Sequence, residues 1–336
     1  MIKPNQSTAP LLEVRALSVD YGLKGVSFRA IEDMSFALRA GEAVALVGES
    51  GSGKTTTAMS IAGLLPPNAR VSSGEVRYRG RRLPIDDDAA MRPHRWSEIS
   101  VVFQGAMNAL NPVHRVVKQI AEPCMLKLGM TREKANGLAR ELLELVGIPA
   151  DRGSAFPHEL SGGMRQRVMI AMALACRPPI IIGDEPTTAL DVITQAQILT
   201  LLGKLRSQLN LALILITHDL SVVAETCDRA MIMYAGRIVE EGTVADIFSE
   251  PKHPYTKLLI ESIPNPATGK KILRPIPGDP PTILNRPSGC AFRSRCSFAM
   301  HVCTTDDPRL DPTGRGQVAC HLHRSLTQEQ KVAAHA

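Results

Sequence analysis

The feature that most constrains the fold is a glycine-rich segment at residues 48–56, GESGSGKTT. It matches G-x-x-x-x-G-K-[ST], a loop whose backbone amides surround phosphates while its lysine and hydroxyl reach the β- and γ-phosphates and Mg²⁺. The apolar run at 43–47 predicts a buried strand before the loop, and the residues after it begin a helix. This context favours a phosphate loop over a chance Gly/Ser turn. The residues predicted to bind nucleotide are Gly48, Ser50, Gly51, Ser52, Gly53, Lys54, Thr55 and Thr56, with Thr55 also a magnesium ligand.

Length and charge limit the remaining possibilities. At 336 residues the chain exceeds the roughly 250–300 residues at which one core stops growing, so we expect one large domain and an appendage. A net charge of +6 fits a nucleic-acid binder or a protein docked near an anionic membrane, and does not decide between them. No apolar run approaches the ~18 residues that a membrane span needs, and the N-terminal residues lack a signal-peptide core. We therefore expect a cytosolic or peripheral protein.

Polar residues follow three further apolar runs. The run at 179–186, PIIIGDEP, predicts a buried strand that ends in two acids, and the runs ending at Gln104 and His218 resemble it. Ligands bind at the carboxyl edge of a parallel sheet, where such side chains gather. We assign Asp184 to Mg²⁺ and Glu185 to the general base that polarises the attacking water. Gln104 alone is a weak signal.

The other segments predict the surrounding architecture. Residues 11–38 alternate as strands, and Tyr21 at the end of the first run either covers a hydrophobic edge or stacks on an adenine base. Residues 70–82 predict a hairpin with turns at Gly74 and Gly80. Residues 112–157 are helical in pattern. In the following LSGGMRQR, Ser161 is a candidate N-cap, and Gly162 and Gly163 at a helix start are a second candidate anion site.

Five segments stand in one order: GESGSGKTT, VVFQ, LSGGMRQR, PIIIGDEPTTALD and ITHD. Together they resemble the nucleotide-binding subunit of an ATP-binding-cassette (ABC) transporter. The resemblance implies an α/β fold: a P-loop core with an N-terminal antiparallel β-subdomain in residues 1–245, and a helical subdomain inserted at about 105–165. By this resemblance, Tyr21 stacks on the adenine, Gln104 contacts Mg²⁺ and water, and His218 stabilises the transferring phosphate. Asp191 corresponds to the D-loop aspartate. The signature residues Ser161, Gly162 and Gly163 bind the γ-phosphate of ATP held by a second subunit.

The segment HPYTKLLIESIPNP at 253–266, with the GDPP that follows, is similar to the C-terminal extension of dipeptide and oligopeptide importer ATPases, so we predict a second region at 246–336. Gly105 and Ala106 depart from the usual form of that family's Q-loop neighbourhood, which leaves the partner and the substrate open. The resemblance implies an ATP-hydrolysing translocase subunit on the cytoplasmic face of the bacterial inner membrane. Its implied partners are a second, different ATPase subunit, two permease subunits and a solute-binding protein, with no nucleic acid.

Other functions stay open. Relatives carry nickel complexes, glutathione or opine-like solutes. An ATPase of a soluble enzyme complex, such as a carbon–phosphorus lyase system, has a similar cassette, although the cysteine-rich tail argues against it. A nucleic-acid ATPase usually carries long coiled coils or tandem cassettes, which this chain does not show.

Four of the seven cysteines, Cys290, Cys296, Cys303 and Cys320, lie in a tail rich in Pro and Gly with the spacing C-x₅-C-x₆-C-x₁₆-C. Four thiolates can hold a [4Fe–4S] cluster or tetrahedral Zn²⁺, and the resemblance favours iron–sulfur over zinc or free thiols. Three histidines nearby could substitute as ligands but are predicted to be solvated; they are His301, His321 and His323. The remaining cysteines are predicted to be inert packing residues; they are Cys124, Cys176 and Cys227.

Overall fold

A computed structural model of the chain describes residues 9–23, 25–105, 109–188, 190–262, 276–282, 286–314 and 316–323. One of its two sheets is antiparallel, with the strand order β2-β1-β4-β5. This sheet confirms the strands predicted over residues 11–38. Its members are β1 (Leu12–Leu23), β2 (Val26–Leu38), β4 (Ala69–Tyr78) and β5 (Arg81–Arg82).

The predicted hairpin at residues 70–82 is right at one glycine and wrong at the other. Gly80 lies between β4 and β5, which pair antiparallel. Gly74 lies inside β4 rather than at a turn, beside an irregularity in the β1–β4 pairing. Its φ is +85°, and a Cβ there would lie 2.4 Å from the carbonyl oxygen of Ala16. Glycine is required at position 74 because the strand bulges there and the backbone of β1 lies very close. The sequence alone does not distinguish such a glycine from one in a turn.

The second sheet has eight strands in the order β11-β12-β10-β9-β3-β8-β7-β6. The strands from β9 to β6 run parallel to one another, and β10 joins β9 antiparallel. Every residue of β3, β7 and β8 is buried, as expected for parallel strands covered on both faces. The strands of the parallel part and its antiparallel neighbour are β3 (Ala43–Val47), β6 (Ile99–Val102), β7 (Ile180–Asp184), β8 (Ala212–Thr217), β9 (Arg229–Tyr234) and β10 (Arg237–Thr243).

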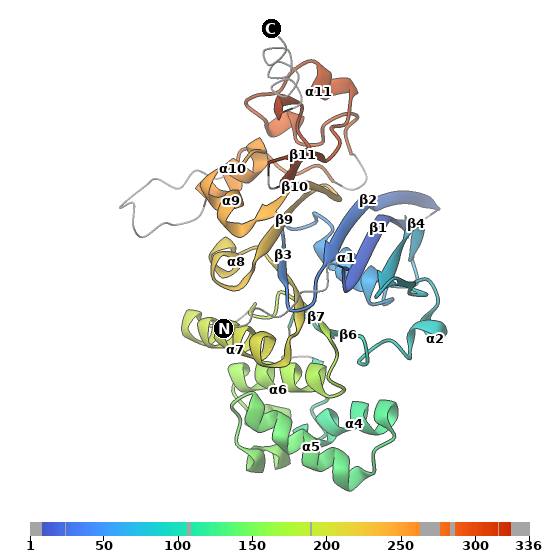
Figure 1. The fold of residues 1–336 in the computed structure, drawn as a ribbon, viewed down its shortest axis with the longest axis vertical. Helices are drawn as coiled ribbons and strands as arrows, with labels where there is room; N and C mark the ends of the chain where they lie inside the picture. The colour runs from blue at the N-terminus through green and yellow to red at the C-terminus, as the bar shows by residue number, and fades with distance from the viewer. Residues whose placement is uncertain are drawn as a thin grey trace.

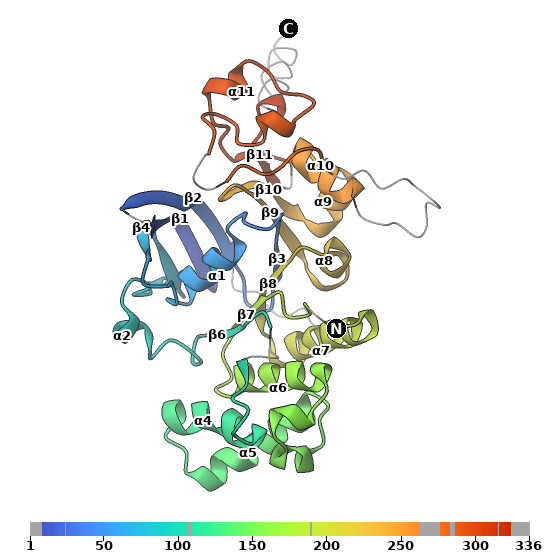
Figure 2. The same ribbon diagram turned by 180° about the vertical axis from the view of Figure 1, so that it is seen from behind.

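Helices surround and extend this sheet (Figures 1 and 2). The helical insertion forms one end of the elongated molecule, below β6 and β7 in Figure 1. Ser161 is the N-cap of α6 (Gly162–Leu174), and its hydroxyl accepts a hydrogen bond from the Met164 amide at 3.3 Å, so the predicted N-cap is confirmed. The helices are α1 (Lys54–Ile61), α2 (Asp88–Met91), α4 (Val116–Leu128), α5 (Arg132–Leu145), α6 (Gly162–Leu174), α7 (Val192–Leu209) and α8 (Leu220–Thr226), with 3₁₀ turns at Ala150–Ser154 and Pro157–Glu159.

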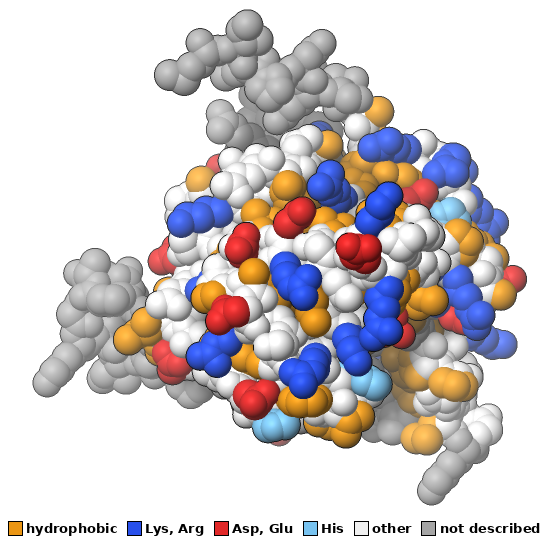
Figure 3. Space-filling view, turned by 90° about the horizontal axis from the view of Figure 1, so that it is seen from below, with side chains coloured by type: hydrophobic (Ala, Val, Ile, Leu, Met, Phe, Trp, Pro, Cys, Tyr) orange, Lys and Arg blue, Asp and Glu red, His pale blue; other side chains and the backbone are white. Residues whose placement is uncertain are grey.

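The end of the molecule that the helical subdomain forms is mixed in character (Figure 3). Basic side chains spread over it among acidic and hydrophobic ones. Several large hydrophobic residues of this subdomain are exposed, including Val113, Leu126 and Leu128.

The C-terminal residues pack at the opposite end of the molecule (Figures 1 and 2). They do not form a separate layer, because β12 pairs antiparallel with β10 and carries the core sheet into the tail. Phe292 is buried against Tyr234 of β9 and Tyr255 of α10, with ring centroids 5.2 and 5.4 Å away. The tail elements are α9 (Val244–Ser249), α10 (Pro254–Glu261), a 3₁₀ turn at Arg293–Arg295, α11 (Val302–Thr305), β11 (Asp311–Thr313) and β12 (Gly316–Val318).

Candidate functional site: a phosphate loop and the carboxyl edge of the parallel sheet

The parallel register brings the predicted strand-end residues to one edge. Val47 of β3 lies opposite Thr217 of β8, and Asp184 of β7 lies opposite Ile216 of the same strand. Val102 of β6 lies opposite Gly183. The residues that follow these strands therefore emerge together, as predicted for a parallel sheet.

The loop between β3 and α1 has the glycine requirements of a phosphate loop. Gly51 and Gly53 have φ values of +77° and +104°. A Cβ on Gly48 would lie 2.3 Å from the Met233 carbonyl oxygen, so the loop approaches β9 too closely for any side chain. The buried Lys54 ammonium donates to the carbonyl oxygens of Gly48 and Glu49 at 2.7 and 2.9 Å, and its burial lowers its pKa.

Two predicted magnesium ligands meet beside this loop. The Thr55 hydroxyl donates to Asp184 Oδ1 at 3.3 Å. Asp184 is 2% exposed, and burial raises the pKa of its carboxyl more than the Thr55 hydrogen bond and the Lys54 charge lower it. A buried carboxylate and a hydroxyl are hard oxygen donors that suit Mg²⁺, and a bound cation would stabilise the carboxylate that burial disfavours.

Glu185 is the centre of a hydrogen-bond network. Its Oε1 lies 3.1 Å from His218 Nδ1, and its Oε2 accepts from Gln104 Nε2 and Thr188 Oγ1 at 2.8 Å each. Burial favours the neutral acid, but the hydrogen bonds from His218 and Thr188 outweigh it, so the pKa of Glu185 is lowered. The carboxylate therefore stays ionised and able to accept a proton at neutral pH.

The backbone of Glu185 is also unusual. Its φ is +46°, a left-handed conformation that non-glycine residues adopt at a cost of about 1–3 kcal/mol. Its amide donates to the Ile216 carbonyl oxygen at 2.9 Å, which fixes this conformation against β8. The turn directs Glu185 away from Asp184, so the two adjacent acids serve different positions.

These groups line one cavity of about 580 Å³. The sequence analysis singled out every residue that lines it, from four separate segments. The lining residues are Ser50, Gly51, Gly53, Lys54, Thr55, Thr56, Gln104, Glu185 and His218.

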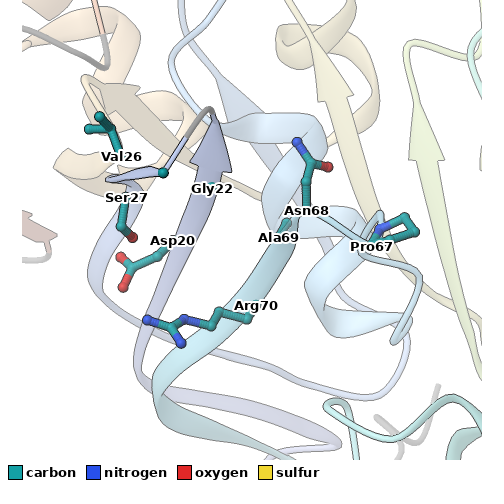
Figure 4. A pocket seen from close by; sticks show the side chains of 9 residues that line it. Asp20, Gly22, Val26, Ser27, Pro67, Asn68, Ala69 and Arg70 are labelled. Atoms are coloured by element: carbon teal, nitrogen blue, oxygen red, sulfur yellow. The ribbon is translucent and has the colours of Figure 1, made fainter.

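Tyr21 lies beside the phosphate loop. Its hydroxyl is 3.4 Å from Thr56 Oγ1, and its ring stacks on Phe28 with centroids 6.0 Å apart. A second cavity, of about 360 Å³, is lined by its strand neighbours Asp20 and Gly22 and by Arg70 (Figure 4). Because alternate strand residues face opposite sides of a sheet, this cavity is separate from the Tyr21 face.

The LSGG residues do not line the phosphate cavity of their own chain. They pack instead on the start of α7: a Cβ on Gly163 would lie 2.5 Å from Thr194 Cγ2. Thr194 is held in turn by Asp191, whose carboxylate accepts from its amide at 2.9 Å and from its hydroxyl at 2.6 Å. The predicted signature and D-loop residues are therefore joined through one threonine.

The four tail cysteines are only partly assembled. The Cys290 amide donates to the Cys303 carbonyl oxygen at 2.9 Å. Within the described part of the chain, no group of three or more His, Cys, Asp or Glu side chains is arranged to hold a metal ion. The prediction that the nearby histidines are solvated is wrong for His321, which is 6% exposed and lies 2.9 Å from the Asp306 carbonyl oxygen.

The other three cysteines behave as predicted. Cys124 and Cys176 are buried, and Cys227 packs against the core. Burial raises the pKa of Cys176 to about 11 and that of Cys227 to about 12, which makes both poor nucleophiles. Ala106 lies outside the described residues, so only Gly105 of the predicted departure is seen, at a φ of +74°.

Sequence reasoning missed three residues that hold the site. Thr188 was not singled out, although it donates to Glu185. Tyr255, part of the HPY segment, accepts a hydrogen bond from the Glu49 amide, and Arg295 pairs with the Glu49 carboxylate. The HPY segment was visible, but only the fold shows that it reaches the phosphate loop.

Comparison with known proteins agrees with this geometry. A family model described as ABC transporter matches residues 31–188, and one described as oligopeptide/dipeptide transporter, C-terminal region, matches residues 239–303. The solved dimeric structure of an ATP-binding cassette in a post-hydrolysis state with ADP and Pi shares the fold, with a TM-score of 0.62 and 30% identity over 69% of this chain and 98% of that one. The chain belongs to the ABC transporter family of ATPases, which use ATP and Mg²⁺.

Two of the similar proteins are named as ATP-binding proteins of peptide transport. The chain is 45% identical to the dipeptide transport ATP-binding protein DppD of Haemophilus influenzae, over 93% of this chain and 95% of that protein. It is 44% identical to the oligopeptide transport ATP-binding protein OppD of Escherichia coli, over 94% of each. Among the described residues, no helix is both long enough and apolar enough to cross a membrane.

The contact between Gly163 and Thr194 generates a stability prediction. Gly163→Ala should destabilise the protein by about 1–3 kcal/mol, because the Thr194 rotamer is fixed by Asp191 and cannot yield. Thr194→Ser removes the clashing methyl group, keeps the hydroxyl, and should restore most of the loss. Urea unfolding of the single and double variants measures both effects.

The matched control is Gly203→Ala in α7, where no atom lies within 4 Å of the added Cβ. Alanine should stabilise that helix slightly. Equal unfolding free energies for Gly163→Ala with and without Thr194→Ser would contradict the contact.

Proposed function

We propose that this protein hydrolyses ATP to energise the import of di- or oligopeptides through an ABC permease. The observation that carries the proposal is the convergence of Lys54, Thr55, Glu185 and His218 on one cavity of about 580 Å³, with Asp184 hydrogen-bonded to Thr55 beside it. The substrate class is supported by the HPY-containing C-terminal region and by the names of the similar proteins.

The residues divide the work of hydrolysis. Lys54 and the loop amides bind the β- and γ-phosphates. Bound Mg²⁺, held by Thr55, Asp184 and Gln104, would neutralise charge on the phosphates. Glu185, kept ionised by its hydrogen bonds, orients a water and accepts its proton. His218, 3.1 Å from Glu185, is placed to donate to the transferring phosphate. Tyr21 would stack on the adenine.

Glu185→Gln should abolish turnover and leave ATP binding intact. Loss of a general base costs ~10²–10⁴-fold in rate, whereas the phosphate and Mg²⁺ ligands are unchanged. ATPase rate and nucleotide retention are measured on the assembled complex. Glu225→Gln, at an exposed glutamate of α8, is the control and should keep the parental rate. Hydrolysis by Glu185→Gln at the parental rate would refute the assignment.

The signature residues act on a partner in this proposal. Ser161 and the α6 N-terminus offer a hydroxyl and free amides suited to a γ-phosphate, but they do not line the cavity of Lys54. Two ATPase subunits would hold two ATP molecules between them, each completing the other's site. ATP would hold the pair closed and hydrolysis would release it, so the permease follows two states. We propose that the second subunit is a different ATPase.

Mixed complexes test action in trans. Ser161→Arg on this chain, combined with a partner subunit whose own phosphate loop is intact, should impair hydrolysis of the ATP that the partner binds. In each of two complexes, the phosphate loop of one subunit is made defective, so that only the ATP bound by the other subunit can be hydrolysed. ATPase assays of the two complexes then report on the two sites separately. Loss confined to ATP on this chain's Lys54 would show that Ser161 acts in cis and would contradict the sandwich.

The tail cysteines are proposed to hold a [4Fe–4S] cluster. The donor set fits a soft metal, and backbone pairing of Cys290 with Cys303 brings two of the four segments together. Burial raises the pKa of the Cys290 and Cys320 thiols to about 11, a cost that metal binding would remove by stabilising the thiolate. Held by Cys290, Cys296, Cys303 and Cys320, the cluster would crosslink the tail.

Metal analysis decides this assignment. Protein purified without oxygen should be brown and contain about four iron and four sulfide per chain. Cys303→Ser should remove the colour and leave ATP binding intact, and Cys227→Ser, in the core, should leave the colour. A colourless anaerobic preparation that contains one zinc would overturn the iron assignment.

The protein is proposed to act at the cytoplasmic face of the bacterial inner membrane, as a peripheral subunit below two permease subunits that a solute-binding protein supplies. The exposed apolar residues of the helical subdomain support a protein contact there. Gly105 precedes this subdomain and adjoins Gln104, so movement of the permease can reach the hydrogen bond from Gln104 to Glu185.

A further inference from the structure

The tail and the phosphate loop are joined by an ion pair between Arg295, which is buried, and Glu49, which is partly exposed. The two terminal nitrogens of Arg295 donate to the two carboxylate oxygens of Glu49 at 2.6 and 2.9 Å. The Arg295 side chain is 3% exposed, and that of Glu49 is 26% exposed. This fork-to-fork geometry is the strongest form of a carboxylate–guanidinium contact and fixes direction as well as distance.

Glu49 lies in the loop itself, and three of its groups are occupied. Its carboxylate binds Arg295, its amide donates to the Tyr255 hydroxyl at 3.0 Å, and its carbonyl oxygen accepts from Lys54 Nζ at 2.9 Å. Two of these three contacts come from the C-terminal region. The third connects Glu49 to the lysine that reaches the phosphates.

Arg295 is itself held on several sides. Its Nε donates to the Pro277 carbonyl oxygen at 2.8 Å, and Nη1 lies 3.3 Å from the Tyr234 hydroxyl. The guanidinium carbon lies 5.8 and 5.9 Å from the ring centroids of Tyr234 and Phe292. The guanidinium is therefore positioned by the tail and β9 before it meets Glu49.

A cavity of about 370 Å³ lies between the tail and the loop, lined on one side by Glu49 and Gly51 and on the other by Pro280 and Thr282. Space on this side means that the loop is not wedged in place by close packing there. The ion pair and the Tyr255 hydrogen bond then carry the connection.

We propose that Arg295 is a positioning residue that sets the geometry of the phosphate loop through Glu49, so that the C-terminal tail tunes the affinity for ATP. The inference rests on the proposed ATPase function. Because the ion pair reaches the phosphate-binding Lys54 through Glu49 but makes no contact with Asp184 or Glu185, its loss should weaken nucleotide binding and leave the chemical step nearly unchanged. In kinetic terms, KM for MgATP rises and kcat does not fall.

The test uses the full-length chain in its assembled complex. Arg295→Met keeps an apolar stem of similar length and removes the charge, and should raise the Kd for a fluorescent ATP analogue and the KM for MgATP about tenfold, equivalent to ~1.4 kcal/mol. Glu49→Gln should give a rise of similar size. The double variant should be no weaker than the worse single variant, because both remove one contact. Arg295→Lys keeps the positive charge but not the two-pronged hydrogen bonding, so its Kd and KM should lie between those of the parent protein and Arg295→Met.

The matched control is Arg293→Met, in the same 3₁₀ turn, where the arginine contacts Ser288 and the Thr304 carbonyl oxygen rather than the loop. It should leave Kd and KM unchanged. Glu49→Gln changes a partly exposed residue and keeps the fold testable if Arg295→Met unfolds.

The outcomes separate the two claims. A parent protein that does not bind or hydrolyse ATP contradicts the proposed function. A parent that does, with Arg295→Met and Glu49→Gln matching the Arg293→Met control in Kd, overturns the positioning role. Additive effects in the double variant, or a fall in kcat at constant KM, would overturn it as well.

Discussion

The structure depends on the parallel pairing of β3 with β8 and β9. This register carries Val47, Thr217 and Ile232 to the same level, so the phosphate loop begins where the neighbouring strands end. Strand β7 pairs with β8, and β6 pairs with β7, which places Glu185 and Gln104 at the same edge. Because β3, β7 and β8 are buried on both faces, a slip of one residue would not expose apolar side chains, but it would move the strand-end residues out of line with one another.

Two kinds of contact then complete the site. At the carboxyl edge of the parallel strands, hydrogen bonds lower the pKa of Glu185 and keep its carboxylate ionised, although its backbone has a strained, positive φ. From outside it, β12 extends the core sheet and Arg295 reaches the loop, so the tail supports the nucleotide site as part of one structure. The signature residues do not line the cavity of their own chain, and Gly163 approaches Thr194 at the start of α7, which is compatible with the proposed role in a second subunit's site.

The sequence was most informative where chemistry and local geometry coincide. Asp184 ends a short buried strand, and the phosphate loop, Glu185 and His218 each follow one, so motif and strand could be predicted together. The tail was not predictable in this way: β12 pairs with β10 across more than seventy residues, and Arg295 meets Glu49 across 246. Gly74 was mispredicted for the same reason, because the need for glycine there comes from the close approach of Ala16 on the neighbouring strand. Contacts between distant segments leave no periodic signal.

Transport by the reconstituted complex tests the central claim most directly. The tagged chain is purified from its native membranes with whatever membrane proteins accompany it, placed in lipid vesicles, and supplied with ATP and the solute-binding protein encoded alongside. The account predicts two co-purified integral membrane subunits, and uptake of a labelled di- or oligopeptide that requires hydrolysable ATP and the loaded binding protein. Recovery of the chain without membrane subunits, or ATP hydrolysis that supports no peptide uptake, would contradict it.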